Sequence, residues 1–143
     1  MGRGKIGILQ NYLGATDDVA RRLYYLGNYL LVRGARTYLF YFAGSTLEWY
    51  PEWELDLGAP TTTAVTVDDL AMGGVYRRDF ANGIVLVNPS SAPVTVALGG
   101  TFQHVVVSGG GAVAADGTTS GGTTLVPVTS IDVGATSAEI LMR

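Results

Sequence analysis

The first forty positions carry two apolar runs separated by residues with a helical spacing. The segment 5–10, KIGILQ, is short and apolar, which predicts a strand that ends at Asn11 and Tyr12. One apolar stripe then recurs at spacings of three and four: Val19, Leu23, Leu26 and Leu30. This spacing predicts an amphipathic helix, with Thr16 as its N-cap and Gly34 as the left-handed residue after its last turn.

A second apolar run follows at 37–42, TYLFYF, without alternation, which predicts a strand buried on both faces. Strand, helix and strand make a βαβ unit with parallel strands and a right-handed crossover. A single helix covers only one face of such a pair. We therefore expect either side chains 38, 40 and 42 or side chains 39 and 41 to need a cover from the later part of the chain or from another chain.

The second half of the sequence reads as short strands separated by glycine and proline turns. Strands are predicted over 75–80, 84–88, 94–98, 101–107, 112–115, 123–128 and 138–142. Asn82-Gly83 between apolar strands predicts a tight hairpin turn with positive φ at both residues. Gly99-Gly100 predicts a turn after which the next strand returns. Strands of this length and spacing are typical of an antiparallel β-sandwich.

These elements predict an α+β fold that is mostly β. The expected boundary lies at 58–63, GAPTTT, which has linker chemistry and no apolar periodicity. We predict a βαβ segment over 1–60 and an antiparallel β-sandwich domain over 61–143. Composition supports the division, because Phe102 is the only aromatic residue beyond residue 80.

Charge and composition exclude several function classes. The net charge is −3 and the pI is near 4.9, so no basic surface for nucleic acid is expected. The absence of cysteine excludes disulfides, thiolate metal sites and cysteine nucleophiles. The sequence has neither a transmembrane-length apolar run nor a signal-peptide pattern, so no membrane partner is predicted and the compartment stays open.

Most residues with catalytic potential have a structural interpretation. His104 is the only histidine and has no partners at the spacing of a catalytic triad or a metal site. The glycines at 109–111 and 121–122 do not follow the strand–loop–helix pattern of a phosphate cradle, so we expect loops. Arg77 and Arg78 beside an aspartate predict a solvated strand face with local pairing. No metal and no cofactor is expected.

The segment 47–54, LEWYPEWE, is the exception, because it combines three aromatic residues with three carboxylates directly after a predicted parallel strand. The carboxyl ends of such strands are where α/β folds place their sites. Aromatic faces and carboxylate acceptors suit a sugar ring, although the same residues could instead cover the junction between two domains. The candidate binding residues are Asn11, Tyr12, Glu48, Trp49, Tyr50 and Trp53; no catalytic residue is assigned.

Three stretches together resemble a known family: YLLVRGARTYLFYF, then EWYPEWELDLGAP, then VYRRDFANGIVLVNPSSAPVTVAL. They are similar to the C-terminal end of glycoside hydrolases in which a (β/α)8 barrel is followed by a β-sandwich. The matching positions are Trp49, Pro51, Glu52, Leu57, Gly58 and Pro60, then Tyr76, Arg77, Arg78, Phe80, Asn82, Gly83, Val85, Leu86, Val87, Asn88 and Pro89. The likeness covers most of residues 5–98.

The resemblance implies that 1–60 is a βαβ remnant of the barrel, comprising its last two strands, and that the partner is an oligosaccharide or polysaccharide. By family, it also implies an extracellular or periplasmic protein. A whole barrel needs roughly 250 residues and a glycosidase needs two carboxyl groups. Glu48 supplies one at most, so we expect no catalysis by this chain alone. Two other functions stay open: a non-catalytic carbohydrate-binding module and a structural, self-assembling protein.

The two barrel-type strands also predict self-association. Without their other neighbours they leave unpaired edges and an uncovered aromatic face, to be met by a second copy or by the missing barrel portion. The expected interface comprises Ile6, Ile8, Tyr38, Phe40 and Phe42. The alternative is a monomer in which the sandwich covers this face.

Overall fold

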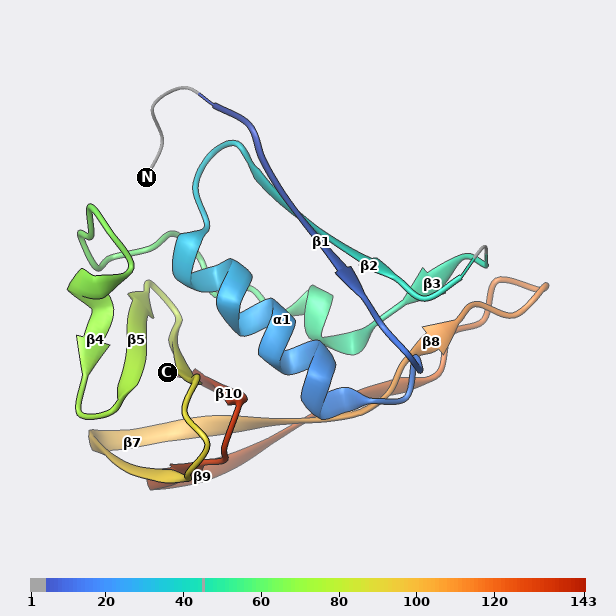
Figure 1. Cartoon of the computed structure of the whole chain (residues 1–143). Helices are drawn as coiled ribbons and strands as arrows, with labels where there is room; N and C mark the ends of the chain where they lie inside the picture. Colours follow the sequence, from blue (N-terminus) through green and yellow to red (C-terminus); the bar gives the residue numbers. More distant parts are fainter. Residues whose placement is uncertain (1–4, 45) are drawn as a thin grey trace.

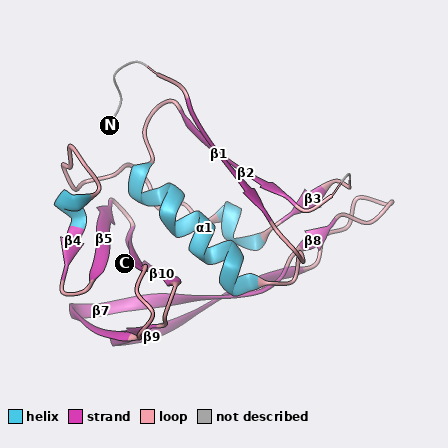
Figure 2. Cartoon of the chain, in the orientation of Figure 1, coloured by secondary structure: helices cyan, strands magenta, loops and turns pink. Residues whose placement is uncertain are grey.

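The computed structural model describes residues 5–44 and 46–143, arranged in three layers (Figure 1). A single long helix, α1, lies between a two-stranded sheet and a six-stranded sheet. Strands make up most of the regular structure (Figure 2), which confirms a mostly β protein of α+β type. The elements are β1 (Gly7–Tyr12), α1 (Val19–Val32), β2 (Thr37–Phe42), β3 (Glu48–Trp49), η1 (Pro51–Glu54), η2 (Asp68–Leu70), β4 (Ala71–Met72), β5 (Val75–Phe80), β6 (Gly83–Asn88), β7 (Val94–Gly109), β8 (Gly111–Ala112), β9 (Gly121–Val133) and β10 (Ser137–Met142).

The N-terminal part forms the predicted strand, helix and strand. β1 and β2 pair in parallel, from Gly7 opposite Thr37 to Tyr12 opposite Phe42. The prediction of two buried faces on β2 is wrong, because its side chains alternate between exposed and covered positions. Tyr41 faces α1 and is 3% exposed, whereas Phe40 is 51% exposed. Only the α1 side of this small sheet has a cover among the described residues.

Both ends of α1 differ from the sequence expectation. Asp18 is the N-cap in place of Thr16, and its carboxylate accepts a hydrogen bond from the backbone N–H of Arg21 at 3.0 Å. Gly34 does not adopt a positive φ. The C-terminus is capped instead by Arg78, whose Nη1 donates to the carbonyl oxygens of residues 30, 31 and 33 at 2.9–3.0 Å. The prediction that Arg78 lies on a solvated face is therefore wrong, because its side chain is buried at this cap.

The main core lies between α1 and the six-stranded sheet. Its buried residues come from both sides of position 60, with Leu30 and Tyr41 from the first segment and Val85 and Ile140 from the second. Close approach is possible because α1 carries Gly27 at the contact: a Cβ there would lie 2.5 Å from the Cβ of Ala138. The two segments therefore share one core.

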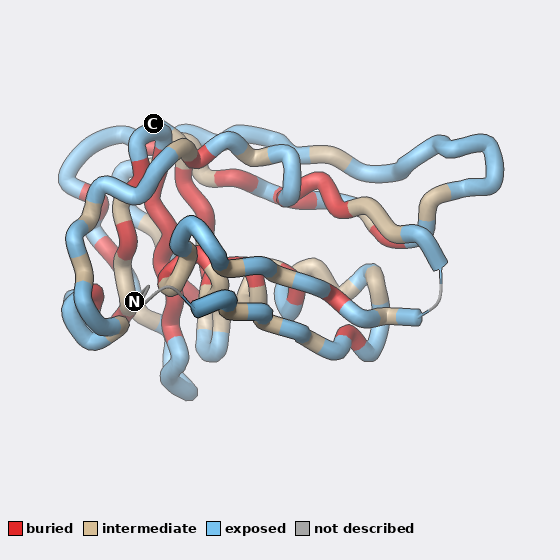
Figure 3. The backbone as a smooth tube through the Cα atoms, turned by 90° about the horizontal axis from the view of Figure 1, so that it is seen from above, coloured by how far each residue is buried: buried red, intermediate tan, exposed pale blue. Residues whose placement is uncertain are grey.

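The large sheet has the strand order β4-β5-β6-β10-β7-β9, and all its neighbours are antiparallel. It is one continuous sheet rather than two separate ones. A second buried cluster lies on its other face: Val75, Ile84, Leu86, Val96, Leu98, Phe102, Val133 and Leu141. The sheet is thus covered on both faces, and Figure 3 shows the buried segments gathered toward one end of the molecule.

Two predicted turns differ from the structure. Residues 94–109 form the single strand β7, which shifts register between Ala97 and Phe102 while staying paired with β9, so 101–107 is not a return strand. Neither residue of Asn82-Gly83 has a positive φ. Glycine is needed at 83 because a Cβ there would lie 2.4 Å from the carbonyl oxygen of Leu141.

Candidate functional site

The candidate segment begins near the carboxyl ends of β1 and β2. Asn11 lies opposite Tyr41 in the register, and Tyr12 lies opposite Phe42. After β2 the chain forms β3 and then η1, which brings Trp53 back against the end of the small sheet. The ring centroids of Trp53 and Tyr41 are 5.6 Å apart. Trp53 of the 48–54 segment is therefore a neighbour of the carboxyl end of β2.

A buried ion pair lies beneath this segment. Arg22 on α1 donates through Nε to Oε1 of Glu52 at 2.8 Å and through Nη2 to Oε2 at 3.2 Å. Both side chains are fully buried. The Arg22 guanidinium also lies 4.7 Å from the ring centroid of Tyr50. Sequence reasoning missed this pair, although Arg22 lies four positions before Leu26 and hence on the buried side of the helix.

The glycines at 109–111 close over the same arginine. Nη2 of Arg22 donates to the carbonyl oxygen of Gly109 at 2.8 Å, and Nη1 donates to that of Thr16. Gly110 has a φ of 90°, and a Cβ there would lie 2.9 Å from Cδ of Pro51. Next along the chain, β8 pairs with β3. This glycine segment is a packing junction. The prediction of loops is wrong for Gly109, Gly111, Gly121 and Gly122, which lie in strands β7, β8 and β9.

Three rings form an aromatic cluster above the ion pair. Tyr50 contacts Trp53 at a centroid distance of 5.0 Å and Tyr41 at 5.4 Å. Tyr50 is completely buried, so its predicted contact with a ligand ring is not available in this structure. Its hydroxyl instead donates to Oε2 of Glu48 at 2.9 Å. Desolvation by burial raises the pKa of both tyrosine hydroxyls above the ordinary phenol range, so both stay protonated and donate.

The remaining candidate residues of this segment reach the surface. Trp53 is 43% exposed, and Trp49 is half-buried with its Nε1 donating to Oε1 of Glu54 at 2.9 Å. Glu48 is half-buried on the adjacent position of β3. Trp49, Trp53 and Glu48 are therefore at least partly accessible, and the Trp49 indole is paired with Glu54, whereas the third carboxylate of the segment, Glu52, is held in the ion pair.

The two candidates on β1 differ from each other. Asn11 is half-buried, and its Nδ2 atom is buried without a hydrogen-bond partner among residues 5–44 and 46–143. Tyr12 is 66% exposed, and its ring packs edge-on against Phe42 at 5.5 Å. Tyr12 thus belongs to the uncovered face of the small sheet more than to the 48–54 segment.

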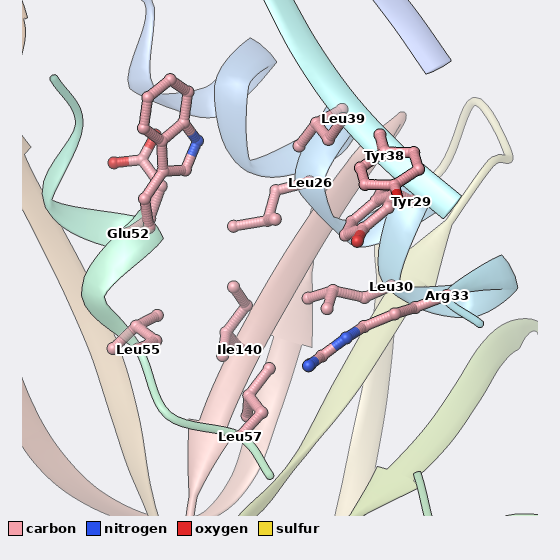
Figure 4. A pocket seen from close by; sticks show the side chains of 11 residues that line it. Leu26, Tyr29, Leu30, Arg33, Tyr38, Leu39, Glu52, Leu55, Leu57 and Ile140 are labelled. Atoms are coloured by element: carbon pink, nitrogen blue, oxygen red, sulfur yellow. The ribbon is translucent and has the colours of Figure 1, made fainter. Parts of the chain in front are cut away.

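A separate cavity of about 360 Å³ opens beside β2 (Figure 4). Its lining is mainly apolar and comes from α1, β2, η1, the chain after η1, and β10: Leu26, Tyr29, Leu30, Arg33, Tyr38, Leu39, Glu52, Trp53, Leu55, Leu57 and Ile140. Trp53 is the member shared with the surface candidates. The cavity follows the flank of the helix, so it does not coincide with the strand ends.

The histidine of this chain lies within the large sheet. His104 on β7 and Glu139 on β10 lie 2.7 Å apart, between Nε2 and Oε2, within the large sheet. Among the described residues, no group of three or more histidine, cysteine or acidic side chains is arranged to hold a metal ion. Within residues 5–44 and 46–143, no helix has both the length and the hydropathy needed to cross a membrane.

Comparison with known proteins identifies a family for this chain. Neither the curated proteins nor the solved structures contain a significant relative of this chain. The family described as hypothetical glycosyl hydrolase family 15 matches residues 4–84, more than half of the sequence. This range includes the small sheet, α1, the 48–54 segment and the β5–β6 turn. The chain therefore belongs to hypothetical glycosyl hydrolase family 15.

Proposed function

We propose that this chain is a C-terminal portion of a carbohydrate-active glycoside hydrolase, which contacts an oligosaccharide or polysaccharide and has no catalytic activity alone. The observation that carries the proposal is the segment 48–54, in which Trp53 is exposed, Trp49 and Glu48 are half-buried, and the Trp49 indole donates to Glu54. Indole faces pack against the C–H surfaces of sugar rings, and carboxylates accept hydrogen bonds from sugar hydroxyls. Family membership supports the same substrate class.

The underlying packing supports a fixed binding surface. Trp53 rests on the buried rings of Tyr41 and Tyr50. Tyr50 in turn lies over the Arg22 guanidinium and donates to Glu48. A side chain held in this way loses little rotamer freedom when a ligand binds, so more of the contact energy contributes to affinity.

The carboxylates argue against catalysis by the chain alone. A glycosidase needs one carboxyl group as acid and a second as base or nucleophile, on opposite sides of the scissile bond. Glu52 is unsuitable because it is buried and paired with Arg22. Glu48 and Glu54 come from one short segment, and no acidic side chain of β1 or β2 faces them.

The small sheet supports descent from a barrel. β1 and β2 are parallel, joined by one helix, and each has an edge without a strand partner among the described residues. In the proposed arrangement, 1–60 supplies the last two strands of the barrel and 61–143 is the C-terminal domain. A reading frame that continues upstream of Met1 with further βα units would support this arrangement.

Sugar binding is tested by calorimetric titration of the chain with a panel of oligosaccharides. We expect weak binding that falls at least about tenfold in Trp53→Ala and in Trp49→Ala, because each removes a stacking face. Leu125→Ala is the control, since Leu125 is an exposed apolar residue on β9, outside this segment and outside the cavity. Absence of binding by the parent chain, or equal binding by both tryptophan variants, would leave the tryptophans as junction packing.

Catalysis is tested separately with aryl glycosides and polysaccharides. The purified chain is expected to show no turnover. Measurable turnover that disappears in Glu48→Gln would contradict the non-catalytic part of the proposal without affecting sugar binding.

A second candidate, an independent carbohydrate-binding module, is favoured by the shared core. Residues of α1 and β2 pack in one cluster with residues of β6 and β10, so the chain buries a core without further barrel strands. Sugar affinity that is unchanged when the rest of a barrel is supplied in trans would favour this candidate.

A further inference from the structure

The uncovered face of the small sheet is formed by alternate residues of two paired strands. Ile8, Gln10 and Tyr12 on β1 lie opposite Tyr38, Phe40 and Phe42 on β2 in the register. Five of these six are large hydrophobic side chains, and each is between 43% and 69% exposed. Ile6, directly before β1, continues the row at 67% exposed. We call these seven residues the β1–β2 face.

We propose that the β1–β2 face is a self-association surface, on which a second copy of this chain packs its own β1–β2 face around a two-fold axis. This inference does not rest on sugar binding. It concerns the chain by itself and a surface that the 48–54 segment does not include. In the proposed barrel the same face would be turned toward the remaining strands, so a second copy and those strands would compete for it.

The area of the face supports a second copy. A whole aromatic side chain buries ~200 Å². The six hydrophobic members of the face therefore expose roughly 600 Å². That value is at the upper end of the largest apolar patches of monomeric proteins. It also approaches the roughly 800 Å² that each partner contributes to a stable interface, with the backbone and flanking residues supplying the remainder.

The absence of charged side chains on the β1–β2 face also favours a second copy of the chain. None of the seven side chains is charged, although the chain as a whole carries a net charge of −3. The single amide, Gln10, donates through Nε2 to the Tyr12 hydroxyl at 3.1 Å within the face. Two copies can therefore bring this face together without opposing like charges, and a two-fold interface needs a patch that complements itself.

The packing geometry is also suitable. Parallel sheets are normally covered on both faces, and here α1 covers one. Two sheets pack face to face at about 10 Å with interdigitating side chains. Phe42 already packs at ring distances of 5.5 Å from Tyr12 and 6.3 Å from Phe40, so the rings form a continuous layer.

The test is light scattering of the purified chain over a range of concentrations. We expect the mass to rise with concentration from 15.0 kDa to twice that value. Phe40→Asp should weaken association at least about 100-fold, because it places two carboxylates in the desolvated interface. The matched control is Leu125→Asp, since Leu125 has the same 51% exposure on the edge strand β9 and should leave association unchanged.

A second measurement keeps the proposal testable if Phe40→Asp does not fold. The chain has no cysteine, so a single spin label can be attached to Gln10→Cys or, as control, to Leu125→Cys. Two-fold packing predicts strong spin–spin coupling for the first label and much weaker coupling for the second. A constant mass of 15.0 kDa, association that persists in folded Phe40→Asp, or no coupling at Gln10→Cys would each overturn the proposal. None of these outcomes alters the titration that tests sugar binding.

Discussion

The two main sheets of this chain use similar apolar side chains but differ in what covers them. The large sheet has α1 on one face and the bent β7–β9 end across the other, so Ile140 is 1% exposed and Leu141 is fully buried. Among the residues that the structure describes, the small sheet is covered by α1 on one face and by nothing on the other, and Ile8 is 69% exposed. The difference shows that apolar periodicity identifies a strand without showing how many of its faces the same chain covers.

The largest expected effect concerns the ion pair that links α1 to the segment after β3. Arg22→Met leaves the Glu52 carboxylate buried without a counter-charge and two carbonyl groups without a donor. We expect a loss of about 3–5 kcal/mol of unfolding free energy, measured by urea denaturation. The double variant Arg22→Met/Glu52→Gln should be more stable than Arg22→Met, because the amide carries no charge. A single-variant loss below about 1 kcal/mol would contradict a structural role for the pair.

The covered and uncovered sheets can be compared directly with two isoleucines. Ile140→Ala removes a side chain from the main core and should cost about 2–5 kcal/mol. Ile8→Ala removes an exposed side chain and should change the stability of the monomer by no more than about 0.5 kcal/mol. The loss of unfolding free energy in each variant is to be measured by urea denaturation, at a concentration where the chain is monomeric. Similar losses at the two positions would mean that the β1–β2 face is covered within one chain.

The close contact between α1 and the large sheet depends on Gly27, which has no side chain. Gly27→Ala introduces a Cβ 2.5 Å from that of Ala138, and overpacking of this kind costs about 1–3 kcal/mol. Alanine recovers up to about 1 kcal/mol of helix propensity, so we expect a net loss of about 1 kcal/mol in thermal or urea unfolding. Gly34→Ala is the control, because a Cβ there meets nothing within 4 Å. Stabilisation by Gly27→Ala would show that α1 moves away from the sheet without penalty.

The smallest effect concerns pH within the large sheet. Burial raises the pKa of the Glu139 carboxyl, and the hydrogen bond with His104 opposes that rise. A carboxyl whose pKa is raised on folding stabilises the fold below its unfolded pKa, and this contribution is lost as the pH rises through the folded value. We therefore expect Glu139→Gln to flatten the fall in unfolding free energy above about pH 4.3, the ordinary value for glutamate. An unchanged pH profile would contradict this assignment.

Local pattern predicted much of the fold. The spacing of apolar residues along the sequence predicted five elements that are present in the structure: β1, α1, β5, β6 and β10. The wrong predictions concern tertiary contacts. Gly83 is required by the carbonyl of Leu141, and Arg78 caps a helix that ends 46 positions earlier in the chain. No local rule could show that Gly99-Gly100 bends a strand without reversing it.

The candidate site was likewise predicted only in part from local sequence. The composition of 47–54 was sufficient to propose Glu48, Trp49 and Trp53 as candidates, and all three side chains are at least partly accessible. It could not show that Tyr50 lies underneath the surface, because that depends on Arg22 from α1 and on Gly109 and Gly110 from the β7–β9 hairpin.

The contact between Arg22 and the Gly109 carbonyl has a consequence for synthesis on the ribosome. The two residues are 87 positions apart, so α1 emerges long before the acceptor of its buried arginine exists. Until the β7–β9 hairpin has been made, Arg22 and Glu52 cannot be fully enclosed. Contacts of such long sequence separation form late and slowly. The ion pair and the Tyr50 ring that packs on it therefore remain incompletely enclosed for most of translation.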